Sequence, residues 1–317
     1  MADIDNPPPI TQIFFGQALG ERARIVQNNK RFVHYTSAEA AFSMIKNAEV
    51  WMRKSSTMND FSEIEHGIEC LFHAYKGPFG ERLKRTLENA HPNIVSQIAE
   101  IFDSWLPHFR LETYLTCISE HEDKEDRTGR LSMWRAYGNV AIVLNKDIFM
   151  SETDALKAYS SPVAYLYPHQ FEVEFGKVVE RAEAASSYLA TLDRELVVHN
   201  VFSMFRYAVL CTKHPGFHEE REWRVIYSPT FELSPRIKKT IEVIRGVPQA
   251  VCKIPLSDAP DDGLNGIEIP KLVNRVIIGP SQYPFAQLEA FIYLLEERGM
   301  SDARERVWVS DVPLRQP

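Results

Sequence analysis

The chain has 317 residues, of which 44% are hydrophobic and 25% charged, and its formal net charge at pH 7 is -7. These values are typical of an ordinary soluble globular protein, long enough for one large domain or two smaller ones. The negative charge gives no overall attraction to nucleic acid or anionic membranes, so the composition disfavours both kinds of partner.

The first twelve residues predict a flexible leader in a cytoplasmic protein. They include three consecutive prolines, Pro7 to Pro9, which cannot donate backbone hydrogen bonds to a helix or sheet. A signal peptide has a basic start and an apolar stretch, which are absent here, and no later run approaches transmembrane length. The four cysteines are far apart and form no CxxC pair, so we expect buried, reduced thiols.

The first elements after the leader carry unusual polar residues. Residues 31–37 predict a short strand with His34 at its centre, and a capping box from Thr36 to Glu39 predicts a helix directly after it. A second strand follows over residues 50–55 and contains Arg53. Asn59 and Asp60 then precede another predicted helix, whose capping pattern pairs Asp60 with Glu63.

The middle of the chain is mostly helical. Residues 80–106 predict helix and residues 113–119 a strand, and the composition of residues 120–130 predicts a solvated loop. A short helix follows over residues 131–137, carries Trp134 and Tyr137, and ends at Gly138. Residues 140–145 form the clearest buried strand, and residues 172–212 again predict helix.

The last third returns to strands, predicted at residues 222–227, 240–244, 250–256, 275–280 and 307–310, with a helix over 284–299. Strands at both ends of the chain with helices between them predict a single α+β domain over residues 13–317.

One predicted strand begins with an unusual amount of charge. In an extended strand, alternate residues share a face, so Glu220, Glu222 and Arg224 are expected to form a carboxylate pair beside a guanidinium. A surface ladder of ion pairs is the structural alternative. Because the strand continues as the apolar "VIY", we expect these charges to lie where the sheet meets a cleft, a place where carboxylates are tuned for catalysis.

The other polar positions also have structural alternatives. A lone histidine such as His34 is more often a hydrogen-bonded core residue than a catalytic one. Trp134 and Tyr137 fit an aromatic core anchor, and Asn59 with Asp60 fits a helix cap. None of these residues identifies a function by itself.

Taken in order, the motifs "HYTS" (34–37), "MND" (58–60) with Glu63, "MWRAYG" (133–138) before "VAIVLN", "EREWRVIY" (220–227) and "RVIIGP" (275–280) resemble the bacterial domain of unknown function 2971 family. The resemblance covers most of residues 31–281. That family is remotely similar to ADP-ribosyltransferases, whose NAD-binding cleft lies between two small antiparallel sheets. The resemblance therefore implies an ADP-ribosyltransferase-like fold with split antiparallel sheets around a cleft and a large helical insertion.

The resemblance also implies an activity, cleavage of the nicotinamide glycosidic bond of NAD. ADP-ribose would pass to water or to a macromolecule, either protein or nucleic acid, as in a toxin or defence effector. Glu222 would stabilise the positive charge that develops on the ribose, Glu220 would orient or deprotonate the nucleophile, and His34 would hydrogen-bond the ribose. Residues implied to bind NAD are His34, Tyr35, Thr36, Arg53, Asn59, Asp60, Trp134, Tyr137 and Arg224, with Arg53 or Arg224 at the pyrophosphate. Because "MWRAYG" is predicted to be helical, Tyr137 departs from the family's stacking tyrosine.

Two other functions stay open. The spacing of Cys211, His214 and His218 is compatible with a metal, and a metal-dependent nuclease could use Glu220 and Glu222, although no standard zinc motif occurs and we expect no metal. A binding module without turnover is the second alternative. The chain lacks GxGxxG, GxxxxGK[ST] and GxSxG, which excludes the simplest dinucleotide-fold, P-loop and α/β-hydrolase readings.

Overall fold

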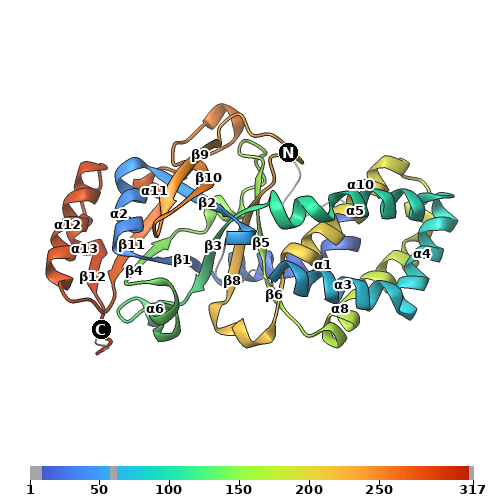
Figure 1. The fold of residues 1–317 in the computed structure, drawn as a ribbon, viewed down its shortest axis with the longest axis horizontal. Coiled ribbons are helices and arrows are strands. Elements are labelled where there is room, and N and C mark those ends of the chain that lie inside the picture. The colour runs from blue at the N-terminus through green and yellow to red at the C-terminus, as the bar shows by residue number, and fades with distance from the viewer. Residues whose placement is uncertain (1–8, 58–62, 314–317) are drawn as a thin grey trace. The chain divides into compact units, whose positions relative to one another are not determined.

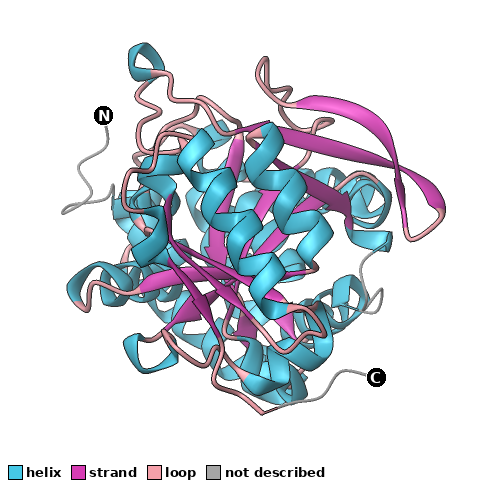
Figure 2. Cartoon of the chain, turned by 90° about the vertical axis from the view of Figure 1, so that its left-hand side faces the viewer, coloured by secondary structure: helices cyan, strands magenta, loops and turns pink. Residues whose placement is uncertain are grey.

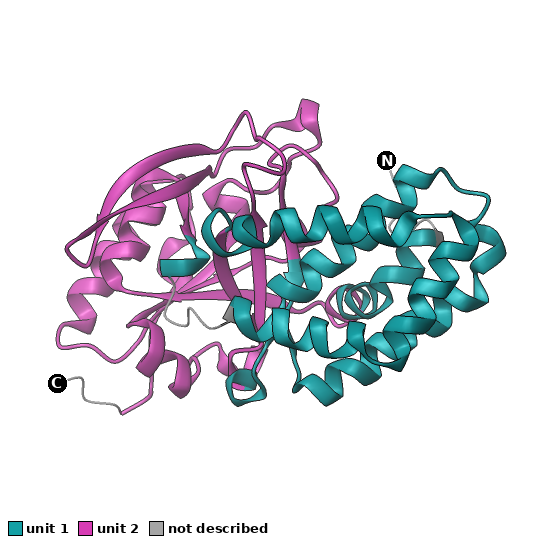
Figure 3. Cartoon of the chain, turned by 45° about the vertical axis from the view of Figure 1, so that its right-hand side comes forward, with its two compact units in different colours: residues 1–23, 54–113, 161–218 teal, residues 24–53, 114–160, 219–317 magenta. Residues whose placement is uncertain are grey.

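The computed structural model describes residues 9–57 and 63–313. The chain forms two compact units, each assembled from three segments (Figure 3). Unit 1 comprises residues 1–23, 54–113 and 161–218, and unit 2 comprises residues 24–53, 114–160 and 219–317. Because the segments of the two units alternate along the chain, no single cut separates them, and the single domain over residues 13–317 stays a prediction.

Unit 1 is helical, as the patterns of residues 80–106 and 172–212 predict. Aromatic rings from α5 and α10 pack together in its core, among them Phe102, Phe109, Phe202 and Phe205. A short parallel pair of strands completes the unit. Its elements are α1 (Pro9–Gln27, which continues into unit 2), α3 (Glu63–Lys76), α4 (Pro78–Ala90), α5 (Ile94–Leu111), α8 (Pro168–Ala184), α9 (Ser186–Leu189), α10 (Arg194–Leu210), β6 (Ala164–Tyr165) and β7 (Thr212–Lys213).

Helix α1 begins inside the predicted leader. Residues 9–12, which we expected to be flexible, are helical, while residues 1–8 lie outside the described part of the chain. Proline is well tolerated at the first position of a helix, where its missing N–H has no partner to lose. The run of prolines thus marks a helix start at Pro9.

Unit 2 is built on an open, mixed sheet of ten strands, which makes the chain α+β as predicted (Figure 1). The order is β12-β11-β4-β1-β3-β2-β10-β9, and β8 pairs with β3 and β5. The strands are β1 (Arg31–Thr36), β2 (Glu49–Lys54), β3 (Tyr114–His121), β4 (Val140–Leu144), β5 (Ala158–Pro162), β8 (Glu222–Tyr227), β9 (Lys238–Ile244), β10 (Val247–Pro255), β11 (Val273–Ile278) and β12 (Val307–Val309).

Helices and short turns connect these strands. They are α2 (Ala38–Asn47), α6 (Leu131–Tyr137), α7 (Asp147–Met150), α11 (Ile269–Leu272), α12 (Pro284–Glu297), α13 (Ala303–Arg306) and the 3-10 turns η1 (Ser55–Thr57), η2 (Asp123–Glu125), η3 (Pro215–Glu220) and η4 (Pro260–Asp262). Among the described helices, none combines the length and apolar character needed to cross a membrane.

The two faces of the sheet are covered by different helices. On one face, residues of α2 and α12 such as Ile45 and Leu295 pack with Phe32 and Ile142 of the strands, and Figure 2 views unit 2 from the side of these helices. On the other face, α6 packs with Val33, Tyr35 and the alternate residues of β4. Successive side chains of β1 therefore belong to different clusters, as strand alternation requires.

Strand β1 separates from β3 halfway along its length. It pairs with β3 only over Arg31 to Val33, but with β4 as far as Thr36. Strand β8 pairs with Tyr114 to Ser119 of β3, and since β1 also pairs with Ser119, β1 and β8 lie on opposite edges of β3. The sheet therefore opens between β1 and β3 at His34.

Candidate functional site

His34 lies where β1 leaves β3. Its Nδ1 is 2.9 Å from the carbonyl oxygen of Cys117, which can only accept, so Nδ1 carries the proton and donates. Burial lowers the pKa of His34 below its ordinary value, and the bond to Cys117 opposes this shift. The ring is therefore neutral near pH 7, and its Nε2 is a hydrogen-bond acceptor.

Gly138 brings the end of α6 against the end of β1. Its φ of 138° suits only glycine, and an added Cβ would lie 2.5 Å from the carbonyl carbon and oxygen of Thr36. Nearby, the backbone N–H of Ala38 donates to Oδ1 of Asn139 at 3.1 Å. The close approach places Tyr137 beside the strand that carries His34.

The helix after β1 is capped by Ser37, whose hydroxyl accepts from the N–H of Ala40, so the predicted cap at Thr36 is wrong.

The hydroxyl of Tyr137 donates a 2.5 Å hydrogen bond to Oε1 of Glu220. Glu220 ends η3, and strand β8 begins only at Glu222. Between them Arg221 has a φ of 45°, in the left-handed region. The predicted extended alternation from Glu220 to Arg224 is therefore wrong at its first member, because the left-handed residue turns Glu220 away from the strand and toward Tyr137.

Glu222 and Arg224 share a face of β8, as predicted. They are opposite Ser119 and Cys117 of β3, and Nε of Arg224 donates to Oε1 of Glu222 at 2.8 Å. Relative exposure is 5% for Glu222 and 0% for Arg224. The pair is thus a buried ion pair, which excludes the surface ladder for these two residues.

Tyr35 and Trp134 lie in the buried cluster under α6. Their ring centroids are 4.9 Å apart in an edge-to-face arrangement, and Trp134 donates through Nε1 to the carbonyl of Thr128 at 2.9 Å. The hydroxyl of Tyr35 accepts from the backbone N–H of Arg130 at 2.8 Å. These positions fit a packing role, and their predicted contact with NAD stays a prediction.

The remaining predicted ligand residues are more dispersed. Thr36 is partly exposed at the end of β1, and Arg53 lies on β2, where its Nε donates to Oε1 of Gln249 at 3.1 Å. Burial lowers the pKa of Arg53, and the charge of Arg245 lowers it further. Asn59 and Asp60 lie outside the described residues.

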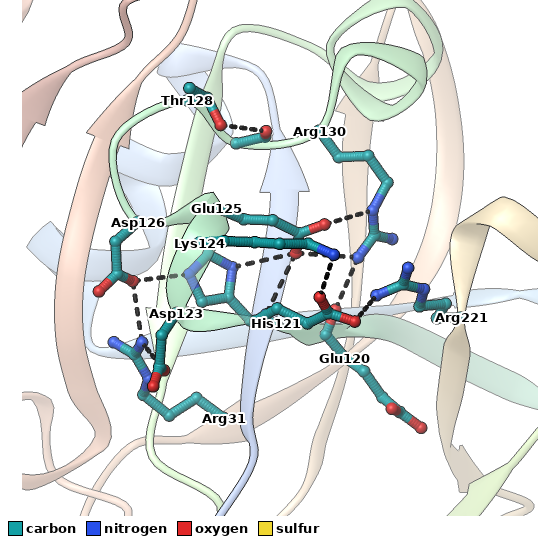
Figure 4. Close-up of polar contacts among 12 residues, drawn as sticks. Arg31, Glu120, His121, Asp123, Lys124, Glu125, Asp126, Thr128, Arg130 and Arg221 are labelled. Atoms are coloured by element: carbon teal, nitrogen blue, oxygen red, sulfur yellow. Dashed lines mark hydrogen bonds and ion pairs between the residues drawn. The ribbon is translucent and has the colours of Figure 1, made fainter.

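The segment predicted as a solvated loop contains a buried charge network (Figure 4). His121 is 1% exposed and its Nε2 lies 2.9 Å from Oδ1 of Asp126, which also pairs with Arg31. Glu125 is 7% exposed and binds Arg130 through both oxygens. Composition alone indicated solvent, but the alternation of acids and bases in "EHEDKEDRTGR" is the signal that these charges pair with one another.

The predicted metal alternative gains no support from the described residues. Within the described ranges, no group of three or more His, Cys, Asp or Glu side chains is arranged to hold a metal ion. His214 packs edge-to-face against Tyr167, and Nδ1 of His218 lies 3.0 Å from the carbonyl oxygen of Pro215. Cys70, Cys211 and Cys252 are buried, as expected for structural thiols, whereas Cys117 is partly exposed.

Residues 133–225 match the model of a family described as "Protein of unknown function (DUF2971)". The matched segment runs from α6 to β8 and contains Trp134, Tyr137, Glu220, Glu222 and Arg224, which supports the predicted resemblance over this part of the chain. No curated protein and no solved structure matches the chain.

Proposed function

We propose that the chain cleaves the bond between nicotinamide and ribose in NAD and transfers ADP-ribose to a protein, a nucleic acid or water. The observation that carries the proposal is the hydrogen bond from Tyr137 to Glu220, which joins segments 83 residues apart in sequence. It brings together an aromatic and an acidic residue of the kinds that the remote similarity to ADP-ribosyltransferases implies.

The opening of the sheet beside His34 also supports the proposal. ADP-ribosyltransferases have a split sheet with a histidine or arginine on the first strand, and here β1 leaves β3 at His34. The neutral ring offers Nε2 as an acceptor, which suits a ribose hydroxyl better than a phosphate. A cleft between the separated strands remains part of the proposal.

The reaction begins with departure of nicotinamide. The bond from ribose C1′ to the nicotinamide nitrogen breaks and its electron pair leaves with the nitrogen, so positive charge develops on the ribose. The carboxylate of Glu222 stabilises this charge, and Arg224 fixes the orientation of that carboxylate. A nucleophilic oxygen or nitrogen of the acceptor then bonds to C1′, and its proton passes to the carboxylate of Glu220.

A buried ion pair can also serve structure alone in a protein that catalyses no reaction. The test must therefore separate a structural role of Glu222 from a catalytic one. Replacing Glu222 by Gln alone removes one charge of this buried pair, which should cost about 3 kcal/mol or more. The substitution Arg224→Gln should have a comparable cost, because it removes the other charge of the same pair. The double variant Glu222→Gln/Arg224→Gln removes both charges, and its stability should recover toward that of the parent.

The rate of nicotinamide release by the double variant should not recover together with its stability. We expect the parent to release nicotinamide from NAD, and the double variant to be slower by about two orders of magnitude or more while remaining folded. Glu242→Gln is the matched control, since it removes an ion-paired carboxylate from another strand of the same sheet. A double variant that is folded and as fast as the parent, or a parent that releases no nicotinamide with any acceptor, would favour the binding module instead.

A chelator tests the nuclease alternative. The proposed reaction uses carboxylates without a cation, so nicotinamide release should be unchanged by excess EDTA. Loss of activity that Mg²⁺ or Zn²⁺ restores would contradict the proposed mechanism.

A further inference from the structure

The turn between Glu220 and Glu222 is strained. Arg221 has a φ of 45°, and a non-glycine residue in the left-handed region costs roughly 1–2 kcal/mol. Such a conformation persists only where the surroundings hold it in place. An extended residue here would return Glu220 to the face of Glu222, away from Tyr137.

Arg130 binds backbone carbonyl groups at the start of this turn and on the neighbouring strand β3, and Figure 4 shows its contacts with Glu120 and Glu125. Its Nη1 donates to the carbonyl oxygens of Glu219 and Glu220 at 2.7 and 3.3 Å. Its Nη2 donates to the carbonyl oxygen of Glu120, at 2.8 Å, near the end of β3. The guanidinium therefore ties the start of the turn to the strand beside it.

The remaining donors of Arg130 go to a buried carboxylate. Nε and Nη2 each lie 3.1 Å from one oxygen of Glu125. A guanidinium has five N–H donors, and the five bonds to Glu125, Glu120, Glu219 and Glu220 use all of them. Arg130 thus has no donor left for a ligand.

The other side of the turn is fixed by β3 and the residue after it. The backbone N–H of Glu120 donates to the carbonyl oxygen of Arg221 at 2.9 Å. The side chain of Arg221 pairs with Glu122 at 2.5 Å. The hydrogen bond from Lys124 and the charge of Arg221 lower the pKa of Glu122 to about 2, although burial opposes this shift. Glu122 is therefore ionised at neutral pH and holds Arg221 in place.

We infer that Arg130 is a positioning residue, which holds the strained turn so that Glu220 reaches Tyr137 while Glu222 starts β8. The inference rests on the proposed function, because it assigns the two carboxylates different roles in one reaction. Arg130 acts through the backbone and touches no substrate. Lysine cannot replace it, since an ammonium has three donors and cannot bind three carbonyl groups and a carboxylate in one plane.

The experiment compares nicotinamide release by the parent, Arg130→Lys, Arg130→Ala and the control Arg127→Lys. Arg127 lies in the same segment, but its guanidinium packs over the ring of Trp308. We expect Arg130→Lys to lower kcat by about 10- to 100-fold with KM for NAD changed less than about threefold, because a small misplacement of reacting groups is costly. Arg127→Lys should keep the parental kcat and KM.

Chemical rescue adds a readout that a purely structural role would not produce. Added guanidinium at concentrations below those that unfold the chain should raise the kcat of Arg130→Ala at least several-fold, and sodium chloride at equal ionic strength should not. If Arg130→Ala does not fold, the Arg130→Lys result stands as the test.

The outcomes separate this inference from the proposed function. An active parent with Arg130→Lys at the parental kcat, or with a loss that matches only its unfolded fraction, overturns the role of Arg130 alone. If the parent releases no nicotinamide, the proposed function and the role of Arg130 are both overturned. A lowered kcat at constant KM, in a folded Arg130→Lys protein, supports the inference.

Discussion

Tyr137 and Glu220 form a hydrogen bond, 2.5 Å long, between the last residue of α6 and the last residue of η3. The hydroxyl of Tyr137 is the donor and Oε1 of Glu220 is the acceptor. The bond also fixes which way the carboxylate faces. Glu220 is therefore held at two places: Tyr137 binds its carboxyl group, and Arg130 binds its backbone carbonyl oxygen.

Tyr137→Phe removes only the hydroxyl and should lower kcat for nicotinamide release by roughly tenfold, because Glu220 loses its orienting donor. The free energy of unfolding should fall by only about 1 kcal/mol, the usual net value of a hydrogen bond. Steady-state kinetics and urea unfolding measure the two effects. Tyr283→Phe, at an exposed tyrosine before α12, is the control, and an equal effect there would contradict the prediction.

Gly138→Ala should destabilise the chain by about 3 kcal/mol or more, since the new Cβ meets the backbone of Thr36. Gly266→Ala is the matched control. Gly266 has a φ of 83° with open space around it, so its change measures backbone strain alone, about 1 kcal/mol. Equal losses in urea unfolding would show that the close approach of α6 to β1 contributes nothing.

Acidification should destabilise the chain through two histidines. Burial lowers the pKa of both His34 and His121 below 6.5, while the unfolded chain has ordinary histidines. As pH falls through about 6.5, the unfolded state takes up protons that the folded state does not, so the free energy of unfolding decreases. It should be nearly constant above about pH 7.5 and fall toward pH 5, and His34→Asn and His121→Asn should each reduce that slope. Unchanged slopes in both variants would contradict this account.

Trp134→Phe separates packing from ligand binding. The variant loses the bond from Nε1 to Thr128 and part of the buried ring, which should cost about 2–3 kcal/mol of stability. If Trp134 serves packing alone, KM for NAD should stay within about twofold of the parental value. A large rise in KM without loss of stability would instead support the predicted contact with NAD.

Local patterns predicted the elements that carry most of the candidate site. The short run of apolar and hydroxyl residues around His34 identified β1, and the glycine after "MWRAY" identified the end of α6. The apolar continuation of β8 favoured a cleft over a surface ladder for Glu222 and Arg224; the two residues are buried, and the cleft stays a prediction. These signals are readable because each depends on residues within a few positions of one another.

Features that depend on distant partners were not predictable in the same way. Arg221 adopts a left-handed conformation at a position where the sequence has neither glycine nor asparagine, the residues that usually indicate one. The residues that hold it come from β3 and the segment before α6. The role of Arg130 could not be predicted because three of its acceptors are backbone carbonyls, which composition does not reveal. The two carboxylates could therefore be predicted from a single sequence, but the turn that separates them could not.

The alternation of segments between the two units has a consequence for synthesis on the ribosome. Strand β1, with the apolar Phe32 and Val33, is translated before its partners β3 and β4. Helices α3, α4 and α5 of unit 1 are translated between β1 and these partners. Pairing between strands so distant in sequence gives a high contact order, so we expect unit 2 to fold slowly and to need protection of β1 by chaperones. The two carboxylates of the proposed site come later still, with η3 and β8, so that site is complete only after both elements have been translated.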